Sequence, residues 1–239
     1  PPAGTSRFRV RKHQQPALRP AALHGTSLRA TAQHFSTQHK LSTTRKVSMI
    51  RTCTATIRSI SPYSPSRMVM EPKKPGEKDN DFEQRTWRLK AHVNRDGYVV
   101  IPFMAFKKAL DGAARLTPRK IGGRGNQTYG QQMKSGVLLT EPLTLSIKGD
   151  ETRPETFMCS IKGDSRGVGG RVPRTFPTVD DWGGTLVFYI MNPTVQKDIF
   201  ETYLREAGQF IGVGRFRPEN GGVYGRFMVD NVEWNEVVT

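Results

Sequence analysis

The segment 210–227, FIGVGRFRPENGGVYGRF, has the composition that points most directly to chemistry. It contains five glycines, three arginines and four aromatic residues, but a single acidic residue, Glu219. Glycine relieves the steric cost of unusual dihedrals and lets backbone N–H groups approach an anion, while arginine makes planar, charge-assisted contacts with phosphate. The segment therefore predicts an anion-binding loop. The residues assigned to it are Gly212, Gly214, Arg215, Arg217, Gly225 and Arg226.

This loop differs from the familiar nucleotide-binding loops. A P-loop carries a Lys-Ser/Thr pair and lies between a strand and a following helix. Here the expected helix, residues 192–208, precedes the glycines, and the segment has no Lys-Ser/Thr pair. The dinucleotide-binding fingerprint is excluded by the same order of elements. We therefore expect no cofactor.

Two further stretches, 118–136 and 160–184, are rich in glycine and in basic residues. Aromatic residues, Tyr129 and Phe176, are interleaved with the charges. Cationic side chains beside a stacking surface are what single-stranded nucleic acid requires, although flexible surface loops with incidental charge are the alternative. The basic residues assigned to nucleic-acid binding here are Arg124, Arg166, Arg171 and Arg174.

Few residues offer catalytic chemistry. Asp79, Asp81 and Asp96 lie in polar stretches, where acids usually only solvate the chain, and His92 is the only histidine after residue 48. A general base needs a positioned partner, and no Ser/His/Asp or Cys/His set can be assembled from the spacing. The two cysteines of the chain lack metal-binding spacing and are too few for a disulfide scaffold, which favours reducing cytoplasm and no metal site.

The formal charge of +16 is unevenly distributed along the 239 residues. Residues 1–70 contain 12 Lys or Arg and no acid, giving +12, whereas residues 71–239 contain 25 basic and 21 acidic residues, giving +4. Such an excess suggests a polyanionic partner. Residues 1–48 are expected to form a disordered basic arm: a dispensable or upstream segment, an arm that grips nucleic acid, or a transit peptide. Their apolar runs are too short for a membrane span, and no membrane partner is expected.

Residues 49–239 have the pattern of one packed domain. Strands are expected at 53–57, 99–101, 185–191 and 223–234, with two further strand-like runs at 136–147 and 156–161. Helices are expected at 103–114 and 192–208. This series fits a ferredoxin-like (RRM-like) α+β fold, in which two helices cover one face of an antiparallel sheet. Insertions are expected at about 61–96, with a long loop at 64–85, and at 117–183.

Two segments resemble a known family, the RAMP superfamily of CRISPR effector backbone subunits. VVIPFMAFKKALDGAAR, residues 99–115, is similar to the superfamily's segment of the form iPGsslKGalR, and residues 210–227 are similar to its C-terminal glycine-rich loop. Both occur in the family's order, and the resemblance covers about residues 50–236. The chain departs from the pattern at Phe103, Met104 and Lys108 and by the insertion RPEN.

The resemblance implies an RNA-binding subunit that oligomerises along a guide RNA, with the target strand and other effector subunits as further partners. It assigns Lys107 and the glycine-rich loop to holding guide phosphate or to shaping the fold beside it. Residues 161–176 would correspond to the hairpin that reaches over RNA toward the neighbouring copy. Two alternatives stay open: an RNA endonuclease of the same superfamily, and a non-catalytic mobile-element protein that binds another protein.

Overall fold

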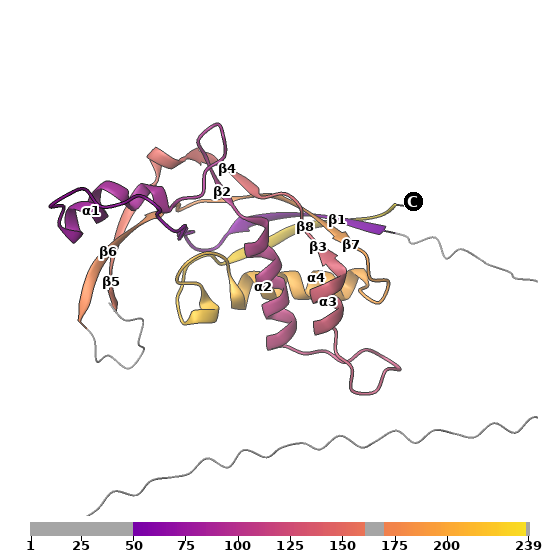
Figure 1. Ribbon diagram of the computed structural model, residues 1–239. Coiled ribbons are helices and arrows are strands. Elements are labelled where there is room, and N and C mark those ends of the chain that lie inside the picture. The colour runs from indigo at the N-terminus through magenta and orange to yellow at the C-terminus, as the bar shows by residue number, and fades with distance from the viewer. Residues whose placement is uncertain (1–49, 161–169, 238–239) are drawn as a thin grey trace, which may run out of the picture. The chain divides into compact units, whose positions relative to one another are not determined.

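A four-stranded antiparallel sheet lies at the centre of the structure (Figure 1). The computed structural model describes residues 50–160 and 170–237, so the arm expected over residues 1–48 lies outside the described residues. In their order across the sheet the strands are β3 (Val137–Leu138), β7 (Gly183–Ile190), β1 (Ile50–Ser59) and β8 (Phe227–Val237).

Two crossovers define the topology. Helix α2 (Phe103–Leu116) lies in the chain between β1 and β3, and helix α4 (Lys197–Glu206) lies between β7 and β8. Because β1 and β3 are both antiparallel to β7, and β7 and β8 are both antiparallel to β1, each crossover joins parallel strands. The β-α-β-β-α-β order with helices on one side of the sheet is ferredoxin-like, and the expected α+β class is confirmed (Figure 1).

Alternation along the strands gives the sheet one covered face and one open face. Cys53, Ala55 and Ile57 of β1 are at most 2% exposed, whereas Thr56 and Arg58 point to the opposite, exposed side. Successive strand residues point to opposite faces, so this period of two buries only one face. Burial raises the pKa of the Cys53 thiol to about 12, which keeps it protonated and inert.

The two helices fill the covered face with aliphatic and aromatic side chains. Phe106 of α2 packs edge-on against Phe227 of β8, with ring centroids 5.9 Å apart. Phe200 of α4 packs against Phe188 of β7 at 5.0 Å. Each of these rings is at most 1% exposed, and burying one such side chain stabilises the fold by about 1.5–3 kcal/mol. This packing fixes α2 against the sheet.

Accessory elements surround the central sheet. Strands β2 and β4 form one antiparallel pair, and β5 and β6 form a second. The pair β5–β6 extends away from the central sheet, beside α1 (Figure 1). The remaining elements are α1 (Asp79–Thr86), η1 (Trp87–Lys90), β2 (Tyr98–Ile101), α3 (Gly130–Gly136), β4 (Leu143–Lys148), η2 (Gly149–Glu151), β5 (Arg153–Ser160), β6 (Arg171–Thr178), η3 (Ala207–Ile211) and η4 (Pro218–Asn220).

A buried carboxylate joins α1 to β6. Glu83 accepts hydrogen bonds from the Lys90 ammonium, from the Thr175 amide at 2.7 Å and from Arg174 at 3.2 Å. Burial opposes the charge of Glu83, but these bonds outweigh it and hold the pKa of its carboxyl below its ordinary value. The bonds anchor the accessory hairpin to the preceding helix.

The structure corrects four expectations from the sequence. Part of the loop expected at 64–85 is helical, because α1 begins at Asp79. The strand-like run 136–147 divides into β3 and β4, which belong to different sheets, and Pro142 lies between them. Strand β2 pairs with β4 outside the central sheet, although its sequence is as apolar as that of a core strand. In place of the helix expected at 192–208, the α-helix α4 spans Lys197–Glu206 and is followed by a π-helical turn, Ala207–Ile211.

Within residues 50–160 and 170–237, no helix has both the length and the apolar composition that crossing a bilayer demands.

A second ion pair predicts how stability depends on pH. Glu206 accepts bonds from both guanidinium nitrogens of Arg119 and from the Thr117 hydroxyl, and the Arg119 bonds hold the pKa of Glu206 below its ordinary value. A carboxyl whose pKa is lowered on folding stabilises the fold above its unfolded pKa, about 4.3, and loses that contribution as pH falls through the lower folded value. Glu206→Gln should cost about 1 kcal/mol at pH 7.

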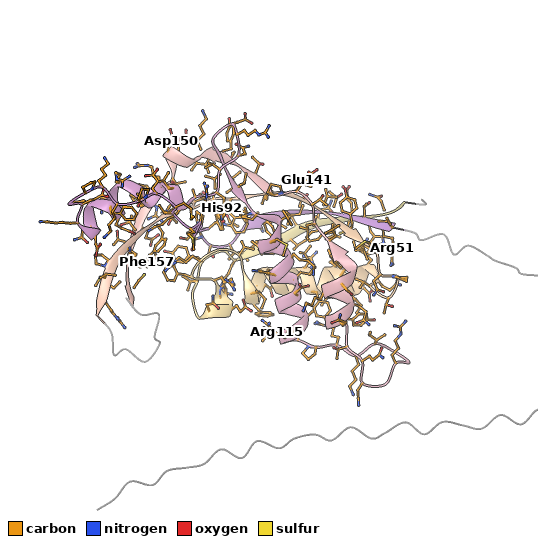
Figure 2. All side chains as sticks on the ribbon, viewed as in Figure 1. Arg51, His92, Arg115, Glu141, Asp150 and Phe157 are labelled. Atoms are coloured by element: carbon orange, nitrogen blue, oxygen red, sulfur yellow. The ribbon has the colours of Figure 1, made fainter. Side chains whose placement is uncertain are left out.

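The measurement is thermal unfolding of the parent and the variant at a series of pH values. Glu206→Gln should lose less stability than the parent on acidification, because one carboxylate that must be protonated is already gone. Glu141→Gln, at an exposed position, serves as the control and should follow the parent (Figure 2). Identical acid dependence in Glu206→Gln and the parent would contradict the role assigned to this pair.

Candidate functional site

The glycine-rich loop, residues 212–226, folds back on itself in a compact form. Its Val213 amide donates to the Gly225 carbonyl at 2.9 Å, and its Tyr224 amide donates to the Phe216 carbonyl at 3.0 Å. Two further bonds tie it to the segment after β1, from Arg215 N–H to the Ser64 carbonyl at 2.8 Å and from Gly225 N–H to the Pro62 carbonyl at 2.7 Å. The loop is therefore a fixed wall beside α2.

Four of its five glycines are required by close packing. A Cβ atom on Gly225 would lie 1.8 Å from the Val213 carbonyl oxygen, and one on Gly222 would lie 1.8 Å from the Phe216 oxygen. Gly212, Gly214 and Gly225 also have positive φ angles of 71°, 79° and 71°. Since the amides of Gly212 and Gly225 already donate to carbonyls of this chain, these two residues shape the loop and do not offer N–H groups to a ligand.

A cleft of about 590 Å³, here the first cleft, lies between this loop and the first half of α2. Pro102, Met104 and Ala105 from the start of α2 form one side, and the ring of Tyr63, itself 2% exposed, contributes from the segment after β1. The cleft is lined by Tyr63, Ser66, His92, Pro102, Met104, Ala105, Lys108, Ala109, Gly212, Val213, Gly214, Arg215, Phe216, Arg217, Glu219 and Asn220.

The electrostatics of the first cleft favour an anion. The N-terminal turn of the 14-residue helix α2 lines it, and the N-terminal end of a helix carries partial positive charge with backbone N–H groups pointing outward. Lys108, Arg215 and Arg217 add three cationic side chains, against the single carboxylate of Glu219. A phosphate group fits this combination better than a neutral ligand does.

Arg215 is held in a rigid position within the cleft wall. Its guanidinium carbon lies 3.9 Å from the centroid of the Phe176 ring and 4.7 Å from that of Phe216. Its terminal nitrogen approaches the Cys159 sulfur at 3.7 Å. Stacking fixes the plane of the guanidinium, so an anion that binds it meets an oriented donor.

Three other residues predicted to bind RNA, Lys107, Arg226 and Arg217, differ in what their side chains contact. Lys107 is 12% exposed and bonds Asp111 and, at 3.1 Å, the Met133 carbonyl, so it ties α2 to α3. Arg226 donates to the Gln209 carbonyl and thereby closes the end of the turn after α4. Arg217 lines the first cleft and is paired with Glu219.

Two more clefts share lining residues with the first. The second cleft, of about 660 Å³, lies between α2, α3 and the loop and shares Lys108, Arg217 and Glu219 with the first. The third, of about 450 Å³, lies between α1 and β6 and shares Ser66 and Arg215 with the first. Together they form a path lined by basic residues along one side of the molecule.

The basic middle region is only partly gathered at these clefts. Arg174 lines the third cleft and bonds Glu83, whereas Arg171 lies exposed at the start of β6. Arg124 lies in the exposed loop between α2 and α3 and lines none of the three clefts. Arg166 falls outside the described residues.

An aromatic cluster, Phe157, Phe176, Phe216 and Tyr224, joins the β5–β6 hairpin to the glycine-rich loop. The rings of Phe157 and Phe216 have centroids 4.5 Å apart, and Phe157 meets Tyr224 edge-on at 5.8 Å. The Tyr224 hydroxyl donates to Glu155 at 2.6 Å. The hairpin base and the cleft wall are thus one packed body, and Figure 2 shows Phe157 on the side of the hairpin.

His92 is the one catalytic candidate that the structure places in a cleft. It lines the first cleft, and burial together with the charge of Arg67 lowers the pKa of its imidazole, so the ring is neutral at physiological pH. Asp79 is paired with Lys73 outside the three clefts. Over residues 50–160 and 170–237, His, Cys, Asp and Glu side chains nowhere gather in a set of three that could bind a metal ion.

The family resemblance assigned Lys107 and not its neighbour Lys108, which lines the first and second clefts. The spacing contained a usable signal: Lys107 and Asp111 are four residues apart, which is the distance of a helical ion pair. Lys108 and Arg115 are seven residues apart and therefore lie on one helical face, which is the face that lines the first and second clefts.

No protein-family model and no curated protein matches this chain significantly. Among solved structures, one chain of the Type III-B Cmr-β complex bound to cognate target RNA, determined by cryo-EM, aligns with a TM-score of 0.42 and 11% sequence identity. The alignment covers 78% of this chain and 61% of that one, so the chain spans less than two thirds of the neighbour's length.

The close packing of the glycine-rich loop predicts unequal effects of two alanine substitutions. Gly225→Ala should destabilise the chain by about 3 kcal/mol or more, because its Cβ would meet the Val213 carbonyl. Gly221→Ala is the matched control, since Gly221 has a similar φ of 76° but nothing within 4 Å of its Cβ position. It should cost only the strain of a left-handed residue, about 1–2 kcal/mol. Denaturant unfolding measures both, and equal losses would contradict the packing constraint at Gly225.

Proposed function

We propose that the chain is an RNA-binding subunit of a CRISPR effector complex and that the first cleft holds the phosphate backbone of a single-stranded guide RNA. The observation that carries this proposal is the convergence of Lys108, Arg215 and Arg217 on a cleft that also receives the N-terminal turn of α2. The same two segments, 99–115 and 210–227, carry the sequence resemblance to the RAMP superfamily.

The form of the site favours a strand over a small ligand. The first cleft shares residues with each of the other two clefts, and an extended chain of phosphates can follow such a path. The cationic groups supply contacts that do not depend on base sequence. Phe216 lines the first cleft and offers a ring near the strand, as proteins that bind single strands commonly do.

The partners follow from the same proposal. Further copies of the chain would line up along the guide, and the target strand and other effector subunits would complete the complex. The β5–β6 hairpin, which extends from the central sheet (Figure 1), would contact a neighbouring copy through its exposed end, where Arg171 lies. Such an assembly would operate in the cytoplasm.

A second candidate function is RNA cleavage, and the position of His92 in the first cleft is the observation in its favour. An imidazole that is neutral at physiological pH can accept a proton. If the chain is a nuclease, bound RNA should be cleaved, and His92→Asn should abolish cleavage while leaving the dissociation constant unchanged. Intact RNA after prolonged incubation with the parent would favour the non-catalytic subunit.

The neighbouring lysines of α2 give a matched test of the binding proposal. Lys108→Ala should weaken binding to single-stranded RNA and reduce the slope of log K against log salt by about 0.7, because one phosphate contact to a single strand is lost. Lys107→Ala removes the same charge one residue away, but its ammonium is bonded to Asp111 and Met133. Its slope should match that of the parent. Fluorescence anisotropy at a series of KCl concentrations measures both slopes.

Three outcomes are informative. A flattened slope for Lys107→Ala alone would place the RNA where the sequence resemblance puts it and not in the first cleft. If both variants have the same salt slope as the parent, RNA does not contact either lysine at this end of α2. A parent chain with no salt-dependent affinity for RNA would contradict the proposed function and favour a protein-binding role.

A further inference from the structure

Glu219 lies at the junction of the first and second clefts and lines both of them. It is the only acidic residue of the segment 210–227. One of its carboxylate oxygens accepts two bonds from Arg217, at 3.0 and 2.8 Å, and the other accepts a bond from Arg115 at 2.7 Å. Two guanidinium groups from different elements therefore converge on one carboxylate.

This arrangement matches the way in which arginines hold a phosphate group. Paired arginines bind the oxygens of phosphate and carboxylate with the same planar donor geometry. Lys108 lines the same two clefts and adds a third positive charge nearby. The structure thus displays an anion position that the chain fills with its own side chain.

The ion pairs are exposed enough to exchange. The side chains of Arg115 and Arg217 are 76% and 32% exposed, and that of Glu219 is 25% exposed. Pairs of this kind contribute little to stability, because solvent screens them. Glu219 sits in a short turn, Pro218–Asn220, followed by Gly221, beside whose Cβ position the space is open.

We propose that Glu219 holds the place of a backbone phosphate in the ligand-free protein, and that an RNA strand running from the first cleft into the second displaces it. This inference rests on the proposed function and deepens it, because it fixes where the strand crosses between the clefts. Arg115 and Arg217 then bind phosphate after they leave the carboxylate. A ligand with one phosphate must compete with Glu219 alone, whereas a strand also contacts Lys108 and Arg215, so the carboxylate selects for long phosphodiester chains.

The test uses the full chain and a fluorescein-labelled single-stranded oligouridine. Glu219→Gln should bind it about three- to ten-fold more tightly than the parent, because the internal competitor is removed. Asp150→Asn changes the net charge by the same amount at an exposed position away from the three clefts (Figure 2) and should bind as the parent does. In an Arg115→Ala background, where one of the two displaced partners is absent, Glu219→Gln should give a smaller gain.

Several results would overturn the inference. They are equal or weaker binding by Glu219→Gln with an unchanged melting temperature, an equal gain from Asp150→Asn, and a full gain in the Arg115→Ala background. If Glu219→Gln lowers the melting temperature, the single variant Arg115→Ala distinguishes the two explanations. Displacement of Glu219 by RNA predicts that Arg115→Ala binds RNA more weakly than the parent. A purely structural role of the carboxylate predicts that Arg115→Ala binds RNA as the parent does. These results leave the proposed function standing as long as the parent binds RNA, whereas a parent without RNA affinity would overturn both.

Discussion

The whole site depends on how closely the two ends of the glycine-rich loop, at Val213 and Gly225, approach each other. Gly225 lies against the Val213 carbonyl, and the amide of Gly225 reaches back to Pro62. This double contact binds the loop both to itself and to the segment that leaves β1. Because α2 is fixed independently by its packing on the sheet, the loop and the helix enclose a cleft of defined width. A side chain at Gly225 would clash with the Val213 backbone and so disrupt the loop that forms one wall of this cleft.

The basic residues near the cleft fall into two groups that composition alone cannot separate. Lys107, Arg119 and Arg226 use their donors on Asp111, Glu206 and the Gln209 carbonyl, and so they hold elements together. In contrast, Lys108 and Arg215 present charge to the clefts. The modest charge of residues 71–239, +4 by sequence, does not exclude basic clefts, since Asp111 and Glu206 are paired within the first group.

The sequence predicted the helices and strands in which apolar residues recur with a clear period. It did not predict which sheet a strand joins, because that depends on pairing with distant parts of the chain. The helix at Phe103 and the strands β1, β7 and β8 follow from apolar spacing, and with them the ferredoxin-like class. Strand β3 has only two residues, so its membership of the central sheet depends on long-range contacts with β7 that leave no local pattern. The glycines of the loop indicated an unusual backbone, and internal packing is the physical reason for four of the five. Lys108 was passed over because a family motif, and not the helical face, guided the choice between neighbouring lysines.

Ultraviolet crosslinking of RNA bound to the full chain, followed by identification of the modified peptides, tests the central claim most directly. The alternative surface is the open face of the sheet, where Thr54, Val187 and Tyr189 lie opposite the buried core. We predict crosslinks in the first cleft, in the peptides that contain Met104 and Phe216. Crosslinks confined to the open sheet face, with the cleft peptides unmodified, would contradict the account.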